Sequence, residues 1–213
     1  MSLIAQELEQ DGNADRSPTE RLVYFSDAVI AIAITLLVLE LPVPHGEAVG
    51  EAWRSLGEAW QEYLGFLISF IVIGTQWLNH NAVFRNIEWT NRRLGQLNLL
   101  WLLTVVVNPF ATKLLVSEVS FPMAFTLYAI LQALAAVVLV LIMRYAQRHE
   151  LARPGTSAAY FRVAVARTLT VAAAFLLAIP VAYFTHWAYA IWWAIPTVVG
   201  FIRRRRATQS AAA

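Results

Sequence analysis

Long apolar runs separated by short polar segments make up most of the chain. The runs cover residues 21–41, 60–84, 94–116, 121–146, 161–184 and 186–202. They are close to the roughly 20 residues that a helix needs to cross a hydrocarbon core about 30 Å thick. The pattern therefore predicts an all-α membrane protein with six transmembrane helices in each subunit. Thr185 and His186 divide the last two runs just after Pro180, so a tight hairpin is expected there, with one kinked helix as the alternative.

The polar residues outside these runs divide the chain into three parts. Residues 1–19 are predicted to form a polar N-terminal tail, 20–203 the transmembrane domain, and 204–213 a basic tail rich in small residues. Only 14% of the 213 residues are charged, whereas soluble domains carry about 25%. Because six spans use up most of the chain, we expect no separate soluble domain and no enzyme.

Lysine and arginine lie mainly on one side of the predicted membrane, which sets the orientation. That side collects Arg16, Arg21, Arg85, Arg92, Arg93, Arg144, Arg148, Arg153, Arg162, Arg203, Arg204, Arg205 and Arg206. The other side has only Arg54 and Lys113, while Arg167 lies inside the fifth run. Both termini are therefore predicted to be cytoplasmic, with 42–59 as the one sizeable external loop. Since the cations lie in loops between spans, membrane lipids rather than nucleic acid are the expected partners.

Residues that could carry cofactor or metal chemistry are few. The chain has no cysteine, which excludes disulfides, thiolate metal sites and cysteine nucleophiles. Its four histidines do not have a usable metal-ligand spacing, and no Ser/His/Asp arrangement can be argued from the sequence. We therefore expect no cofactor and no resident metal ion.

One face of the first apolar run is singled out by a heptad-like stripe. At about 100° per residue, this face carries Arg21, Phe25, Ala28, Ile32, Thr35 or Leu36, and Leu39. Val38 is expected roughly opposite the stripe. Because an apolar stripe of this kind is more often a helix–helix seam than a pore lining, periodicity alone leaves both interpretations open.

Ser26 and Asp27 point away from the stripe, toward the expected neighbouring helices. An ionised carboxylate inside a span costs several kcal/mol unless it is paired, so Asp27 needs a partner. Arg21, His80 and Asn108 are the candidates, and the alternative is that Asp27 reaches the membrane surface. His80 is expected to hold the Arg21–Asp27 cluster by hydrogen bonds rather than to sense protons.

The first helix resembles the signature helix of the transmembrane protein 175 family, which comprises endolysosomal potassium channels and shorter bacterial relatives. The family pattern is Arg, three residues, Phe-Ser-Asp and an Ala/Ile-rich run ending in Ile-Thr-Leu-Leu-Val-Leu-Glu. Two further elements, Trp-x-x-His-His and Pro-Phe-x-Thr, are also similar, although Asn81 replaces the second His. The matching positions, which we expect to form a structural network, are Arg21, Phe25, Ser26, Asp27, Trp77, His80 and Asn108.

The resemblance implies a single six-helix unit that assembles as a homotetramer, with the first helix of each subunit lining a central pore. Ile32, five positions after the motif aspartate, would form an apolar constriction that Leu36 and Leu39 continue. Thr35, eight positions after the aspartate, would influence cation preference. These positions coincide with the stripe that periodicity singles out.

The implied function is a leak-type channel for K⁺ in a bacterial-type plasma membrane. No Thr-Val-Gly-Tyr-Gly-like loop occurs in the sequence, so a filter of backbone carbonyls is not expected. A ring of Ile32 side chains would instead close the pore by excluding water, and when open it would favour the cation that sheds water more readily. The alternatives are a secondary transporter or proton-coupled carrier, which usually shows internal repeats, and a non-conducting scaffold subunit.

Overall fold

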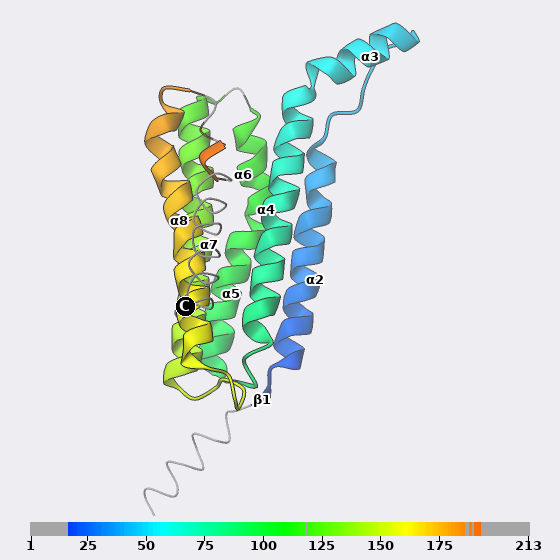
Figure 1. Ribbon diagram of the computed structural model, residues 1–213. Helices are drawn as coiled ribbons and strands as arrows, with labels where there is room; N and C mark the ends of the chain where they lie inside the picture. The colour runs from blue at the N-terminus through cyan, green and yellow to red at the C-terminus, as the bar shows by residue number, and fades with distance from the viewer. Residues whose placement is uncertain (1–16, 118, 186–187, 189, 193–213) are drawn as a thin grey trace, which may run out of the picture.

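The computed structural model describes residues 17–117, 119–185, 188 and 190–192, most of them helical (Figure 1). The helices are α2 (Glu20–Leu36), the 3₁₀ helix η1 (Leu37–Glu40), α3 (Val49–Glu58), α4 (Trp60–Phe84), α5 (Arg92–Val106), α6 (Asn108–Leu115), α7 (Phe121–Arg148) and α8 (Ala158–Ala182). Two short strands, β1 (Ser17–Pro18) and β2 (Trp89–Thr90), pair antiparallel.

Four segments of the described chain are long and apolar enough to cross a membrane: α2 with η1, α5 with α6, α7, and α8. The helix α4 passes the same test together with α3, and the chain bends by 56° between these two helices. The chain is therefore a multi-pass membrane protein, with four or five candidate spans among the described residues. The sixth predicted run, 186–202, lies almost entirely outside those residues.

The third predicted span is divided rather than continuous. It consists of α5 and α6, which meet at Val107. Pro109 has no N–H to donate to the preceding turn, and its ring crowds the carbonyl four residues earlier. The proline therefore ends one helix and starts the next, where it occupies the first turn of α6.

The segment 42–59, expected as an external loop, contains the amphipathic helix α3. The Glu51 carboxylate accepts hydrogen bonds from the amides of Glu47 and Ala48, which stabilises the start of this helix. Ser55 and the His45 ring lie 2.9 Å apart, so the preceding segment is fixed against α3. In Figure 1, α3 extends away from the bundle beyond the start of α4.

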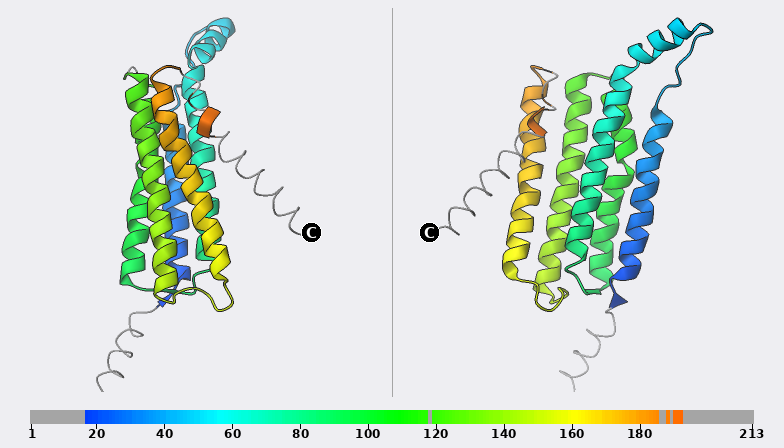
Figure 2. Two further views of the ribbon diagram at one scale, coloured as in Figure 1. Left: turned by 60° about the vertical axis from the view of Figure 1, so that its left-hand side comes forward. Right: turned by 45° about the vertical axis from the view of Figure 1, so that its right-hand side comes forward.

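The spans stand side by side in an elongated bundle with α2 and α8 at opposite edges and α7 next to α8 (Figure 2). Within the most apolar window of each span, 61% of α7 is buried in the bundle, against 22% for α2 and 22% for α8. α8 packs along α7, α7 packs on α5 and α6, and α2 packs on α4 and α5. The α2 edge is therefore open on the side that faces away from these neighbours.

One end of the bundle carries most of the described cations, and we call it the arginine-rich end. It comprises β1, the start of α2, the α4–α5 loop and the α7–α8 loop, with Arg85, Arg92, Arg93, Arg144, Arg148, Arg153 and Arg162. Backbone hydrogen bonds join these loops: Glu88 N donates to Leu151 O at 2.9 Å, and Arg153 N donates to Asn86 O at 2.9 Å. The loops therefore form one connected platform beneath the helices.

Candidate functional site: the first transmembrane helix and its anchors

The buried face of α2 packs against the rest of the bundle through small and branched side chains. Ile30, Ala33 and Leu37 are each at most 2% exposed and belong to the main hydrophobic core with Ile73 and Trp101. Their spacing of three and four residues places them on one side of the helix. This packing fixes which side of α2 faces outward.

Ser26 anchors the same face of α2 through a buried chain of hydrogen bonds. The Asn98 side-chain amide on α5 donates to Ser26 Oγ at 2.8 Å, and Ser26 donates to Leu22 O at 2.7 Å. His80 Nε2 on α4 lies 2.8 Å from Asn98 Oδ1, which can only accept, so the imidazole donates. The chain His80–Asn98–Ser26 thus connects α4, α5 and α2.

His80 is fully buried and enclosed by aromatic rings. It stacks on Phe84 at 4.2 Å and on Trp101 at 4.4 Å between ring centroids. Its Nδ1 has no hydrogen-bond partner among the described residues, and no group of three or more possible metal ligands occurs there. The geometry describes a tightly packed imidazole that orients Asn98.

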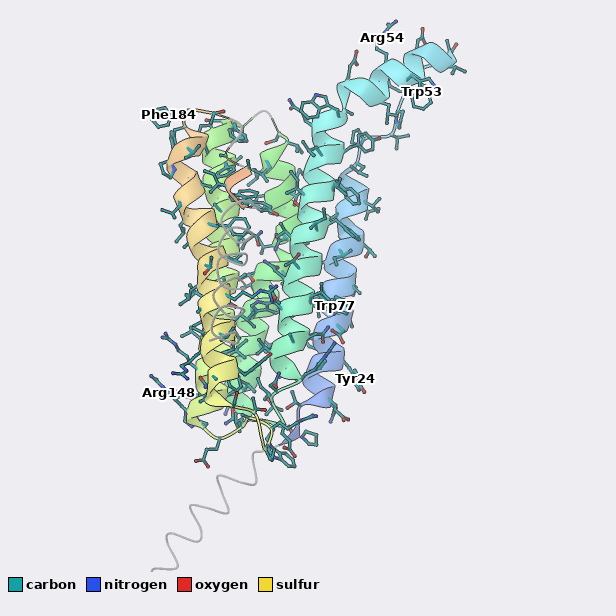
Figure 3. All side chains as sticks on the ribbon, in the orientation of Figure 1. Tyr24, Trp53, Arg54, Trp77, Arg148 and Phe184 are labelled. Atoms are coloured by element: carbon teal, nitrogen blue, oxygen red, sulfur yellow. The ribbon has the colours of Figure 1, made fainter. Side chains whose placement is uncertain are left out.

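Asp27 is bonded to an indole rather than to any of the three partners expected from the sequence. The Trp77 Nε1 of α4 donates to Asp27 Oδ1 at 2.9 Å, and Figure 3 shows Trp77 alongside α2. Asp27 is half-buried, while Arg21 is exposed and makes no ion pair within the described part of the chain. His80 therefore does not hold an Arg21–Asp27 cluster, although it reaches α2 through Asn98.

The outward face of α2 is apolar and largely uncovered within one subunit. Phe25 is 50% exposed, Ile32 59%, Leu36 42% and Leu39 74%. Thr35 is also exposed, and because its hydroxyl donates to Ile32 O at 2.9 Å, its oxygen remains able to accept hydrogen bonds. This face is the stripe that the periodicity singled out.

The placement of Val38 opposite the stripe is wrong. Val38 is 51% exposed, and the buried residue next to it is Leu37. The reason is that the α-helical period ends at Leu36, where η1 begins. In a 3₁₀ helix each residue turns about 120° rather than 100°, so angles extrapolated from α2 do not hold for Val38.

Asn108 belongs to a second polar cluster, away from α2. Gln132 of α7 donates to Asn108 Oδ1 at 2.6 Å, and Asn108 donates to Thr104 O at 3.0 Å. Gln76 of α4 donates to Gln132 Oε1 at 2.5 Å. Asn108 thus holds the break between α5 and α6 against α7 and α4.

A hydroxyl cluster adjoins this second site. Thr112 donates to Ser69 Oγ at 2.7 Å, and Ser69 lies 3.3 Å from the Tyr128 hydroxyl. All three side chains are at most 4% exposed. In a membrane interior such groups need partners within the protein, and here they pair across α4, α6 and α7.

Asn98, Gln132, Gln76, Ser69 and Tyr128 are the polar anchors that the sequence interpretation missed. Each is a polar side chain inside an apolar run, which was the available signal. The sequence does not show which of them meet, because Ser26 and Asn98 are 72 positions apart and Gln76 and Gln132 are 56 apart.

Comparison with known proteins finds relatives of the first half of the chain. A family model described as "Endosomal/lysosomal potassium channel TMEM175" matches residues 21–109. A protein of Streptomyces collinus named a potassium channel is 44% identical over 95 residues, which are 45% of this chain and 46% of that protein. The human protein named "Endosomal/lysosomal proton channel TMEM175" is 27% identical over 143 residues, 65% of this chain and 28% of its own length. The match thus spans about half of the bacterial relative.

The similarity of fold extends further along the chain. The crystal structure of a lysosomal potassium-selective channel TMEM175 homolog from Chamaesiphon minutus superposes with a TM-score of 0.70 and 28% sequence identity. The superposition covers 86% of this chain and 96% of that one. The family-model match, the bacterial relatives and the shared fold agree: the chain is similar to the TMEM175 family in sequence over its first half and in fold over most of its length.

Proposed function

We propose that the chain assembles as a homotetrameric, leak-type K⁺ channel in the plasma membrane, with α2 of each subunit lining the pore. The membrane domain spans 20–203 and is flanked by cytoplasmic tails, 1–19 and 204–213. The observation that carries the proposal is the division of α2 into two faces. One is packed and hydrogen-bonded to its own subunit, and the other exposes Phe25, Ile32, Leu36 and Leu39.

The exposed face supports an assembly of several copies. A single α2 at the edge of a bundle encloses nothing, whereas several copies around an axis enclose a passage. A relative in Streptomyces collinus is named a potassium channel, and the similar crystal structure is described as potassium-selective. A cation channel is therefore the function that the exposed face and the relatives favour together.

In this proposal the narrowest part of the pore is a ring of Ile32 side chains, continued by Leu36 and Leu39. A narrow apolar ring expels water, and a cation without its hydration shell has a high energy there. Opening then requires the α2 helices to move apart or rotate. In the open pore, K⁺ passes more readily than Na⁺ because it loses water more easily, and Thr35 oxygens replace part of that water.

The anchors on the opposite face of α2 maintain the orientation of the pore-lining side. Ser26 and Asp27 are adjacent on α2, but their partners lie on different neighbours. Asn98 of α5 bonds to Ser26, and Trp77 of α4 bonds to Asp27. Two bonds in different directions resist rotation of the helix about its axis. The motif residues thus position the lining without contacting the permeating ion.

The test is ion flux from liposomes that contain the purified protein. With a K⁺ gradient we expect K⁺ efflux faster than Na⁺ efflux, at rates above carrier turnover, from a particle whose mass corresponds to four chains. Saturable exchange that requires an ion on both sides would support a transporter instead. Absence of flux from folded, oligomeric protein would support the scaffold alternative, and a monomeric conducting particle would contradict the pore model.

Protons need a separate arm of the same experiment, because vertebrate relatives are named proton channels. A pH-sensitive dye enclosed in the liposomes reports H⁺ entry, while a K⁺ electrode reports K⁺ efflux. K⁺ efflux that persists at equal pH on both sides identifies K⁺ as a permeant ion. H⁺ entry without K⁺ efflux would contradict the proposed K⁺ permeation.

A further inference from the structure

A cleft of about 380 Å³ opens at the arginine-rich end, between the start of α2 and the end of α4. The residues that bear on its chemistry are Thr19, Glu20, Tyr24, Arg85, Glu88 and Arg153. None of them lies on the Ile32, Leu36 and Leu39 face. Any ligand of this cleft would therefore bind away from the proposed ion path.

Thr19 contributes a buried hydroxyl to the lining of the cleft. Threonine at the start of a helix ordinarily accepts a hydrogen bond from an amide of the first turn. Thr19 makes no such bond, is 5% exposed, and its Oγ1 has no hydrogen-bond partner among the described residues. The first-turn amides of α2 also lack a side-chain cap, and such amides attract anions such as phosphate.

The charged groups of the cleft are of both signs and are not paired with each other. Arg85 and Arg153 supply two guanidinium groups, while Glu20 and Glu88 supply two carboxylates. Among the described residues the only ion pair is that of Lys113 with Glu40, at the opposite end of the bundle. The two guanidinium groups and the two carboxylates are therefore available to a ligand that carries both an anionic and a cationic part.

The cleft lies where a lipid headgroup would reach it. It is bounded by the ends of two long apolar helices, and the aromatic side chains of Tyr24 and Trp89 line it while being 68% and 38% exposed. Tyrosine and tryptophan at span ends favour the headgroup level of a bilayer. Figure 3 shows Tyr24 at this end of α2, directed away from the bundle.

We propose that this cleft binds the headgroup of a phosphatidylethanolamine-type lipid. The phosphate is bound by Arg85, Arg153 and the Thr19 hydroxyl, through charge-assisted hydrogen bonds. The primary ammonium group donates to Glu88 and Glu20. Lipid binding at this site does not depend on whether the protein conducts ions.

The charges predict discrimination among phospholipids. A primary ammonium has three N–H donors, as in lysine, whereas the quaternary ammonium of phosphatidylcholine has none. Phosphatidylglycerol lacks the cation and would place its net negative charge beside two carboxylates. Selectivity thus comes from the glutamates, and affinity for any phospholipid comes from the arginines.

The test is native mass spectrometry of delipidated protein titrated with dioleoyl phosphatidylethanolamine or dioleoyl phosphatidylcholine. We expect the ethanolamine lipid to bind about tenfold tighter, the effect of roughly one charge-assisted hydrogen bond. In Glu88→Gln the affinities for the two lipids should differ by no more than about twofold. Arg85→Gln should weaken the binding of both lipids by about tenfold, because it removes a group that binds the phosphate. If Arg85→Gln does not fold, Arg153→Gln tests the phosphate contact instead.

The matched control is Arg148→Gln, at the same end of the bundle but on the opposite side from Tyr24 in Figure 3. It should leave both affinities unchanged. Soluble O-phosphoethanolamine should not displace the lipid, and complete displacement would point to a free metabolite instead. Equal binding of the two lipids by the parent protein, or unchanged selectivity in Glu88→Gln, would overturn the proposal.

Discussion

The indole of Trp77 on α4 donates a 2.9 Å hydrogen bond to Asp27 on α2, so the motif carboxylate is held by a neutral donor. Trp77→Phe removes this donor while keeping an aromatic ring in place. We expect it to reduce the free energy of unfolding by about 1.5–3 kcal/mol, the range for hydrogen bonds to charged groups. This is less than the about 3–5 kcal/mol expected when a buried ion pair is broken.

A double-mutant cycle with Asp27→Ala isolates this interaction, because alanine has no acceptor for the indole N–H. Unfolding of both single variants and the double variant is followed in detergent by loss of helical signal. The two substitutions should be non-additive, because each removes the same bond. Additive effects would show that Asp27 obtains its stabilisation from some other group.

Asn98 joins α4, α5 and α2 and should therefore be the most sensitive of the polar anchors. Asn98→Leu keeps the volume but leaves the His80 Nε2–H without its acceptor in a fully buried site. Each orphaned buried group costs about 1–3 kcal/mol. We expect a lower melting temperature and a smaller oligomeric fraction in size-exclusion chromatography. The control Asn79→Ala changes a half-buried side-chain amide that makes no hydrogen bond among the described residues, and it should behave like the parent.

The polar anchors show where prediction from sequence reaches its limit. The apolar runs predict the helices well, because a span must hide its backbone and expose apolar side chains. The motif residues Ser26, Asp27, Trp77 and His80 could be selected from the sequence. Their partners could not, since Asn98 is one amide among several and meets Ser26 only when α2 and α5 pack.

The helix ends show the same limit for the fold. Pro109 predicts a break in the third run through its missing N–H, and this signal was available before the structure. The change to a 3₁₀ helix at Leu37 has no comparable signal, which is why Val38 was misplaced. Helix α3 was not predicted from the sequence, because its ten residues are too few and too polar to resemble a span.

Ile32→Asn tests the proposed constriction. A polar ring should hold water where an apolar ring excludes it, so K⁺ leak through reconstituted protein should rise by about tenfold for each ~1.4 kcal/mol removed from the barrier. Selectivity for K⁺ over Na⁺ should fall in the same variant, because the ion no longer has to lose water.

The control for Ile32 is Leu177→Asn on α8. Leu177 has the same exposed fraction within the subunit, 59%, but lies on the opposite edge of the bundle. Its replacement should leave flux and selectivity near the parent values. A larger effect at Leu177 than at Ile32 would mean that α8, and not α2, lines the pore.

Gly65 on α4 allows close approach of the chain after α6. A Cβ atom at this position would lie 2.6 Å from Val116 Cγ1, which is closer than contact allows and belongs to a stiff branched side chain. Gly65→Ala should therefore lower stability by about 1–3 kcal/mol in thermal unfolding. Gly74→Ala in the same helix meets no atom within 4 Å, and it should be neutral or stabilise by up to about 1 kcal/mol. Equal effects would show that Val116 moves aside without cost.

The short 3₁₀ helix η1 allows the C-terminal end of the first span to change its winding. Three-fold winding turns each residue about 20° further than α-helical winding and lengthens the chain by about 0.5 Å per residue. Rewinding η1 as α-helix would therefore swing Leu39 by about 60° relative to Leu36 and shorten the segment by about 2 Å. Helix α2, which is held by the hydrogen bonds of Ser26 and Asp27, would not have to move. Glu40, at the end of η1, is paired with Lys113 of α6 at 2.8 Å, and Leu37, at its start, is packed in the core, so both contacts oppose that rewinding.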